Sequence, residues 1–311
     1  MHADLTDPIF TDETAARAYL EANRWPNGAT CPHCGGVSNV KKMEGKSHRP
    51  GLYICNDCRG HFTVTVGTVY ERSHIPLHKW LLATHLLSAS KKGISTHQLH
   101  RMLGITYKSA WFMTHRIREG MKDTSAGAMG GEGQHIEADE TYLGNKEGVK
   151  KARSTHHKHA VFTLVERGGK ARSFHVDKVT AKKLDEIMRA NVSLESTLNT
   201  DEALRYVKMG KAFNAHQVVN HSKGQYGLGD HTTNTVEGFF SIFKRGMKGV
   251  YQHCGEAHLQ RYLVEFDFRY SNRAKLGVTD RERADKALKG IEGKRLTYRR
   301  INERTATPSL G

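Results

Sequence analysis

The sequence predicts a mixed α/β protein in which a small cysteine-rich region and a helical region precede a sheet-containing domain. Three observations support this fold class. Two cysteine pairs lie near the start of the chain, amphipathic helical patterns follow them, and strand patterns alternate with helical patterns from residue 135 onward. The chain has 311 residues, which is enough for two or three domains.

The composition favours a polyanionic partner. The formal net charge is +16, and an excess of this size in a soluble protein points first to nucleic acid. The chain does not open with a basic segment followed by an apolar one, and His85 interrupts its longest apolar run, "WLLATHLL". We therefore expect a cytoplasmic protein without a membrane partner.

Residues 1–70 are expected to form a short helix and a zinc ribbon. Thr11 is expected to cap a helix over 12–25. Two Cys-x-x-Cys pairs stand 20 residues apart and comprise Cys31, Cys34, Cys55 and Cys58. Because nothing indicates secretion, this spacing favours a tetrahedral zinc–thiolate site over disulfides, with redox-active or incidental cysteines as alternatives. Four protein ligands leave no open position for a substrate, so this zinc would be structural. The segment 61–70 alternates like a strand.

Residues 71–121 resemble a helix-turn-helix region. A helical pattern over 75–90 is followed by two short amphipathic helices that are separated at 104–106, and Ser95 or Thr96 is expected to cap the first of them. The second helix carries the basic residues Lys108, Arg116 and Arg118, which we expect to contact DNA. A helix pair that binds nothing is the alternative.

A glycine-rich linker is predicted over 122–134, an α/β domain over 135–270 and a basic extension over 271–311. In the α/β domain, strands are predicted over 135–144, 159–166, 171–177, 194–200 and 215–220, and helices over 181–191, 201–210 and 234–245. Thr180 is expected to cap the first of these helices. The histidine-rich run 156–159 is expected to lie in a solvated loop, and His221 and His231 flank a glycine-rich loop.

Three acids in this domain suit a catalytic site better than a purely structural role. Asp139 lies within a predicted strand, where aspartate is unfavourable, although it could simply face solvent. Asp201 lies where a strand meets a helix and could instead be a helix cap. Glu237 follows 35 residues later on the polar face of the last helix, which it shares with Asn234 and Lys244. Lys244 returns to this face two turns after Glu237, where it could hold a phosphate, and Arg245 is either a DNA-backbone contact or a surface residue.

The segments "CPHCG", "CNDC", "ADETYLG", "NTDEALRY" and "TNTVEGFFSIFKRG" together resemble the DDE-class bacterial insertion-sequence transposases with an N-terminal zinc ribbon, the ISXO-like group. The resemblance covers nearly the whole chain. It implies a ribonuclease-H-like catalytic domain in which Asp139, Asp201 and Glu237 bind two magnesium or manganese ions. Some relatives have asparagine at the third position, so Asn234 is the alternative to Glu237. The resemblance also implies a homo-oligomer that acts on transposon ends and target DNA, near the nucleoid.

The residue types agree with this chemistry. Cutting and joining DNA is phosphodiester transfer, which two hard cations about 3.5 to 4 Å apart can promote. Carboxylates are the ligands that magnesium prefers, and neither a small-molecule substrate nor a covalent protein intermediate is required. Two alternatives remain: a DNA-binding regulator in which the acids are incidental, and a nuclease that only hydrolyses.

Overall fold

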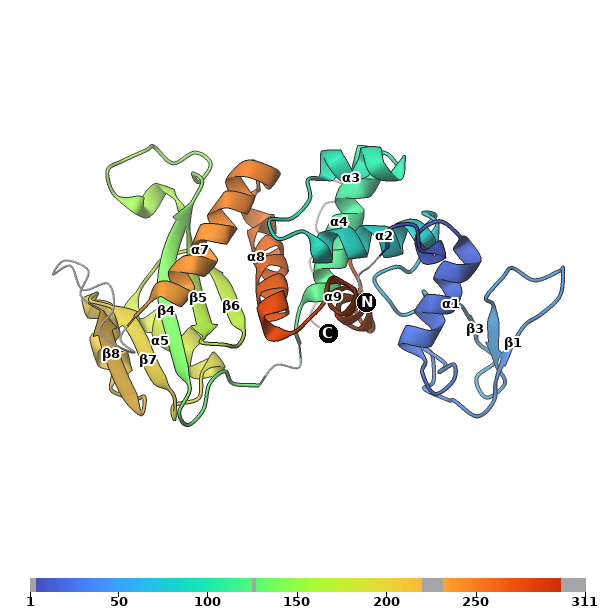
Figure 1. Cartoon of the computed structure of the whole chain (residues 1–311), viewed down its shortest axis with the longest axis horizontal. Coiled ribbons are helices and arrows are strands. Elements are labelled where there is room, and N and C mark those ends of the chain that lie inside the picture. The colour runs from blue at the N-terminus through green and yellow to red at the C-terminus, as the bar shows by residue number, and fades with distance from the viewer. Residues whose placement is uncertain (1–3, 125–126, 220–231, 298–311) are drawn as a thin grey trace, which may run out of the picture.

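We analysed a computed structural model, which describes residues 4–124, 127–219 and 232–297. The described chain is elongated, with a small three-stranded sheet at one end, a larger sheet at the other and a group of helices between them (Figure 1). No helix in these ranges is both long and apolar enough to span a bilayer. The glycine-rich loop with His221 and His231, and the last 14 residues, lie outside the described part.

The N-terminal end contains one helix and a small antiparallel sheet. Helix α1 spans Glu13–Arg24, and its cap is Asp12 rather than Thr11, because the Asp12 carboxylate accepts a hydrogen bond from the Ala15 amide. The sheet has the order β1-β2-β3. Its strands are Val40–Lys42, Tyr53–Cys55 and His61–Phe62.

The strand predicted over 61–70 is therefore mostly wrong. Beyond β3 the chain forms turns, and the Arg24 guanidinium donates to the carbonyls of Val64 and Val66. These carbonyls are engaged by a side chain from α1, so they do not take part in a strand ladder.

The predicted helix pair is confirmed in its local details. Helix α2 (Leu77–Ala89) is followed by α3 (Thr96–Leu103) and α4 (Tyr107–Met121). The Ser95 side chain caps α3 by accepting from the Gln98 amide. Gly104 ends α3 with a φ of 59°, a left-handed conformation that favours glycine, and Thr106 caps α4.

A mixed five-stranded sheet forms the other end of the described chain, with the order β6-β5-β4-β7-β8. The strands are β4 (His135–Leu143), β5 (His159–Glu166), β6 (Ala171–Val176), β7 (Thr197–Asp201) and β8 (Ala215–Val219). Strands β4, β5 and β6 pair antiparallel, whereas β7 and β8 run parallel to β4. The predicted mixed α/β class with flanking helices is confirmed.

Helices cover both faces of this sheet (Figure 1). Helix α5 (Ala181–Asn191), capped by Thr180 as predicted, packs on one face through Leu184 and Met188. Helix α7 (Asn234–Gly246) packs on the other through its phenylalanines. The shorter helical segments are η1 (Pro8–Phe10), η2 (Thr155–His157), η3 (Leu204–Tyr206), α6 (Val207–Gly210), η5 (Met247–Tyr251) and η6 (Ala274–Leu276).

Helix α8 (Glu256–Ser271) was not predicted as an element, although it connects the two ends of the molecule. It lies along β6, an edge strand whose amide groups need partners. Side chains of α8 supply them: Ser271 accepts from the Ala171 amide, Asp267 from the Ser173 amide and Gln260 from the His175 amide. The helix therefore closes the edge of the sheet without adding a strand.

Helix α9 (Asp280–Lys289) lies in the basic C-terminal region and packs against α1, α2 and α4. A capping box of Thr279 and Glu282 starts it. The described part of this region is thus joined to the N-terminal helices, while the division of the chain into five regions stays a prediction.

Candidate functional site

The four cysteines of the two pairs converge at one point. Their sulfur atoms all lie within 4.8 Å of one another, with 3.7 Å between Cys31 and Cys58 and 3.6 Å between Cys34 and Cys55. A tetrahedron with Zn–S bonds of about 2.3 Å has edges of about 3.8 Å, whereas a disulfide is only about 2.05 Å long. The cluster therefore fits a structural zinc ion and does not fit disulfides.

Asp139 and Asp201 come from neighbouring parallel strands. Asp139 lies on β4 opposite Thr163 of β5, and Asp201 is the last residue of β7. The carboxylate oxygens of Asp139, Glu140 and Asp201 lie within 4.8 Å of one another, and among the described residues this is the acidic group close enough to share an ion. We call these three residues the acidic cluster. Two of the three acids predicted from the sequence are thus brought together, and the structure adds Glu140.

The carboxylates of the acidic cluster lie close enough to repel one another when they are charged. Burial, with added repulsion from Glu140, Asp201 and Glu237, raises the pKa of Asp139 to about 7. Burial likewise raises the pKa of Glu140, opposed by Arg205, whose Nε lies 3.4 Å from its carboxylate. A divalent cation would relieve the repulsion, and an all-oxygen donor set is the kind that magnesium or manganese prefers. The residues present therefore fit a hard divalent metal.

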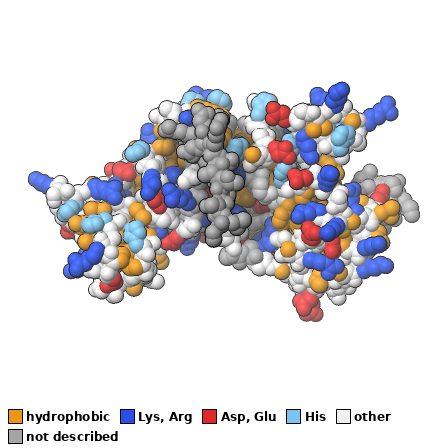
Figure 2. Space-filling model, turned by 180° about the vertical axis from the view of Figure 1, so that it is seen from behind, with side chains coloured by type: hydrophobic (Ala, Val, Ile, Leu, Met, Phe, Trp, Pro, Cys, Tyr) orange, Lys and Arg blue, Asp and Glu red, His pale blue; other side chains and the backbone are white. Residues whose placement is uncertain are grey.

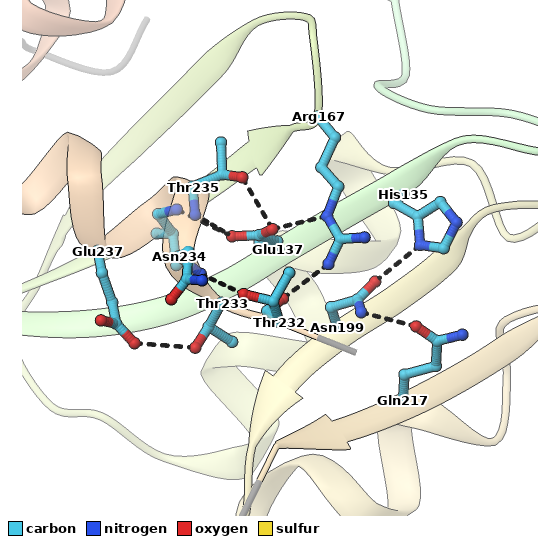
Figure 3. Close-up of polar contacts among 11 residues, drawn as sticks. His135, Glu137, Arg167, Asn199, Gln217, Thr232, Thr233, Asn234, Thr235 and Glu237 are labelled. Carbon is cyan, nitrogen blue, oxygen red and sulfur yellow. Dashed lines mark hydrogen bonds and ion pairs between the residues drawn. The ribbon is translucent and has the colours of Figure 1, made fainter. Parts of the chain in front are cut away.

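The remaining predicted residues lie on α7. Asn234 is its first residue and Glu237 follows one turn later, and both are exposed. The Glu237 carboxylate accepts a hydrogen bond of 3.0 Å from the Thr233 hydroxyl (Figure 3). Glu237 lies outside the acidic cluster, but its charge makes a contribution, smaller than that of burial, to the raised pKa of Asp139. Lys244 lies two turns further along and is half-buried.

Glu137 fixes the start of α7 to the sheet. It is fully buried on β4, and its carboxylate accepts hydrogen bonds from the amides of Thr235 and Val236 and from the Thr235 hydroxyl (Figure 3). Arg167 donates to the same carboxylate at 2.7 Å and to the Thr232 carbonyl at 2.8 Å. A carboxylate beside the first amides of a helix is favourable because it neutralises the positive end of the helix dipole. Glu137 therefore sets the position of Glu237 relative to Asp139.

The basic residues predicted to contact DNA differ in how exposed their side chains are. Lys108 is exposed in the first turn of α4, which is the part of a second helix that normally reaches bases. Arg116 is half-buried and donates to the carbonyls of Glu71 and Leu296. The side chain of Arg245 is exposed and donates to the Ser241 carbonyl on its own helix. Lys and Arg side chains are spread over both ends of the molecule in the view of Figure 2.

The prediction for Arg118 is corrected. Its side chain is fully buried, and its Nε lies 2.6 Å from the Glu265 carboxylate of α8. A guanidinium in this position cannot contact DNA. Arg118 instead joins α4 to α8, because the second half of α4 is covered by α8 and α9.

Sequence reasoning missed the roles of Glu137 and Glu140. Glu137 alternates with Asp139 on the same strand face, and this pattern is equally compatible with an auxiliary acid and with a solvent-exposed residue. Simple alternation would put Glu140 on the opposite face, but it lies beyond the last paired residues of β4 and β7, where its carboxylate comes near Asp201. The one available signal was the density of three acids within the four residues from 137 to 140.

Comparison with known proteins agrees with the two sites. Residues 130–271 match the ISXO2-like transposase domain, and residues 11–61 match the transposase zinc-ribbon domain. Over 280 residues the chain is 29% identical to an "Uncharacterized protein in transposable element ISH50" from Halobacterium salinarum, an alignment that covers 84% of this chain and 91% of that relative. The chain therefore belongs to the insertion-sequence transposases that combine an N-terminal zinc ribbon with an ISXO2-like transposase domain.

Proposed function

We propose that this transposase cuts DNA strands at transposon ends and then joins the freed 3′-hydroxyl to target DNA. The observation that supports this reaction is the acidic cluster at the end of β7, beside the start of α7. We assign Asp139, Asp201 and Glu237 as the ligands of two magnesium or manganese ions. When bound, such ions promote deprotonation of the attacking hydroxyl and stabilise the negative charge on the leaving 3′-oxygen.

Different residues would carry out different parts of this reaction. Asp139 and Asp201 approach from two strands of a rigid sheet, which limits their movement. Glu237 lies on α7, near enough for its charge to act on Asp139, and Lys244 on the same helix would hold a phosphate next to the reacting bond. In the first step water replaces the 3′-oxygen at phosphorus, and in the second the 3′-hydroxyl replaces a 3′-oxygen of the target.

The third ligand is assigned to Glu237 rather than Asn234 for two reasons. A carboxylate neutralises part of the charge of a dication, whereas an amide does not. Glu237 also acts electrostatically on Asp139 already. Glu140 lies closer to Asp139 and Asp201, but Arg205 already balances its charge, so we propose that it supports the site without holding the ions.

The other parts of the chain would select the DNA. We propose that the zinc ribbon and the first turn of α4, with Lys108, bind the transposon end, while Arg116 and Arg245 contribute to the DNA-facing charge. Because two ends must be brought together, a homo-oligomer is expected. A protein that acts in this way would be cytoplasmic and associated with the nucleoid.

The test is incubation of the purified protein with linear DNA that carries the terminal sequences of its own element. In the presence of magnesium we expect a nick with a free 3′-hydroxyl at each end, followed by joined products with a supplied target plasmid. Omission of magnesium should abolish both products but leave DNA binding in place, because the zinc of the ribbon is retained.

Five substitutions separate the assigned roles. Asp139→Asn, Asp201→Asn and Glu237→Gln should each reduce cleavage by roughly 100-fold or more, because each removes charge from the metal site. Glu140→Gln is the matched control and should cost less than about tenfold. A large loss in Asn234→Ala combined with an active Glu237→Gln would reassign the third position to Asn234.

The same reactions distinguish the alternative functions. Cleaved ends that are never joined to target would indicate a nuclease that only hydrolyses. Magnesium-independent binding with no cleavage, unchanged in Asp139→Asn, would indicate a DNA-binding regulator. Either result would overturn the proposal.

A further inference from the structure

Two histidines and a glutamate meet at a point that the proposed reaction does not use. His159 is the first residue of β5, His175 lies on β6 beside it, and Glu256 begins α8. The two imidazole rings have centroids 5.5 Å apart. The run 156–159 was expected to be solvated, but His157 and His159 are buried. We call His159, His175 and Glu256 the histidine cluster.

The ring nitrogens of this cluster face one carboxylate without bonding to it. Nδ1 of His159 lies 3.8 Å from Oε1 of Glu256, and Nε2 of His175 lies 3.9 Å from the same oxygen. Both distances are too long for a hydrogen bond. These two nitrogens are buried and have no hydrogen-bond partner among the described residues. Buried polar atoms are normally satisfied, so the pair requires an explanation.

Ordinary structural roles explain only part of this arrangement. Glu256 lies in the first turn of α8, where an acid is favourable beside the positive end of the helix dipole. That role accounts for the acid but not for two imidazoles aimed at it from two strands. His159 is only 7% exposed, so its unpaired nitrogen is not satisfied by bulk water.

We propose that the histidine cluster binds a divalent transition-metal ion of the zinc class. The three ligand atoms lie within 4.8 Å of one another. Zinc bonds of about 2.0 to 2.1 Å to nitrogen and oxygen give a tetrahedron with edges of about 3.4 Å, so small side-chain rotations would close the site. Imidazole suits zinc, cobalt and nickel rather than magnesium, and Glu256 is half-exposed, so water can complete the coordination.

This site is separate from both metal sites described above. Along β5, His159 pairs with Leu143, whereas Asp139 pairs with Thr163 four residues away, a separation of about 13 Å along the strand. The cysteine cluster is at the other end of the molecule (Figure 1). An ion in the histidine cluster would tie the start of α8 to β5 and β6, next to the point where Gln260 holds the edge of β6.

The experiment counts zinc in the full-length protein. The ribbon is loaded with zinc, magnesium is added at about 10 mM to compete at the acidic cluster, and the protein is dialysed against buffered free zinc of about 1 µM before elemental analysis. We expect about two zinc ions per chain in the wild type and about one in Glu256→Gln and in His175→Asn. His253→Asn changes an exposed histidine near Glu256 in sequence and should retain about two.

Cobalt gives an independent readout. Co²⁺ added to the protein with zinc already in the ribbon should produce weak visible absorption without a thiolate charge-transfer band, and both variants should lose it. Glu256 is exposed, so the fold should survive Glu256→Gln, which circular dichroism would verify. One zinc in the wild type, or two in either variant, would overturn the proposal.

Discussion

At the scale of single residues, Asp267 shows how a buried contact sets the protonation of a carboxyl group. It lies on α8 and accepts hydrogen bonds of 2.7 Å from the Ser173 amide and 2.6 Å from the Ser173 hydroxyl. Burial nevertheless raises its pKa to about 7, although these bonds and Arg172 favour the charged form. The proton therefore binds more tightly in the folded protein than in the unfolded chain, where the pKa is about 3.9.

This difference predicts how stability changes with pH. The contribution of Asp267 is fully present below about pH 4 and is lost as the pH rises through about 7, because only the folded state must bury the charge. Asp267→Asn keeps both hydrogen-bond partners but cannot ionise. Between pH 5 and 8, its free energy of unfolding should therefore fall by about 2 kcal/mol less than that of the wild type. Thermal unfolding of both proteins across this range measures the effect. Parallel pH profiles would contradict the assignment.

At the scale of secondary-structure elements, the joint between β4 and α7 decides the geometry of the proposed active site. Asp139 is carried by the strand and Glu237 by the helix, and the buried Glu137 connects the two. Arg167 neutralises Glu137 and also holds the residue before the helix cap. A small movement of α7 would separate the acids without removing any of them, and misplacement of about 1 Å can cost about 100-fold in rate.

We predict that Glu137→Gln loosens this joint. The amide oxygen can still accept from both helix amides, but the NH₂ group faces the Arg167 donor, so the magnesium concentration for half-maximal cleavage should rise by about tenfold. Glu132→Gln is the control, because Glu132 is an exposed acid just before β4, and it should leave the magnesium requirement unchanged. A fall in melting temperature with an unaltered magnesium requirement would mean that Glu137 stabilises the fold without positioning the site.

At the scale of the whole molecule, a buried ionic network joins the N-terminal helices to the sheet-containing end. Glu265 of α8 pairs with Arg118 of α4 and with Arg269, and it also accepts from the Tyr251 hydroxyl. Burial opposes the charge of Glu265, but Arg269 and Arg118 hold the pKa of this carboxyl below its usual value. Removing one partner from such a network leaves the others buried and uncompensated.

Glu265→Ala should therefore cost about 3 to 5 kcal/mol of stability, because Arg118 and Arg269 would keep buried charges without a counter-ion. Glu186→Ala breaks the exposed pair with Lys183, whose charged atoms are 3.4 Å apart, and should cost less than about 1 kcal/mol. Urea unfolding of the two variants makes the comparison. Similar losses in both would show that the network does not hold the two ends together.

Much of the fold follows from signals that lie close together in the chain. The Thr180 cap, the two strands β5 and β6 and the end of α3 at Gly104 depend on a few neighbouring residues, so their patterns predicted them. Helix α8 was missed because its role is to bind a strand edge 85 to 100 residues earlier in the chain, and no local pattern records that contact. The strand expected after the second cysteine pair does not form for a similar reason. Arg24, which lies far from it in the sequence, binds the carbonyl groups of Val64 and Val66.

The sequence by itself determined the zinc ribbon, the order of strands and helices from β4 to α7, and the pairing of Asp139 with Asp201 as candidate ligands, because spacing and periodicity carry that information. Only the tertiary structure decided that Glu137 anchors α7, that Arg118 is buried rather than DNA-facing and that two histidines converge on Glu256. The physical reason is that burial and charge pairing depend on which distant residues become neighbours. Those neighbours are set by the packing of the whole chain and not by any single stretch of sequence.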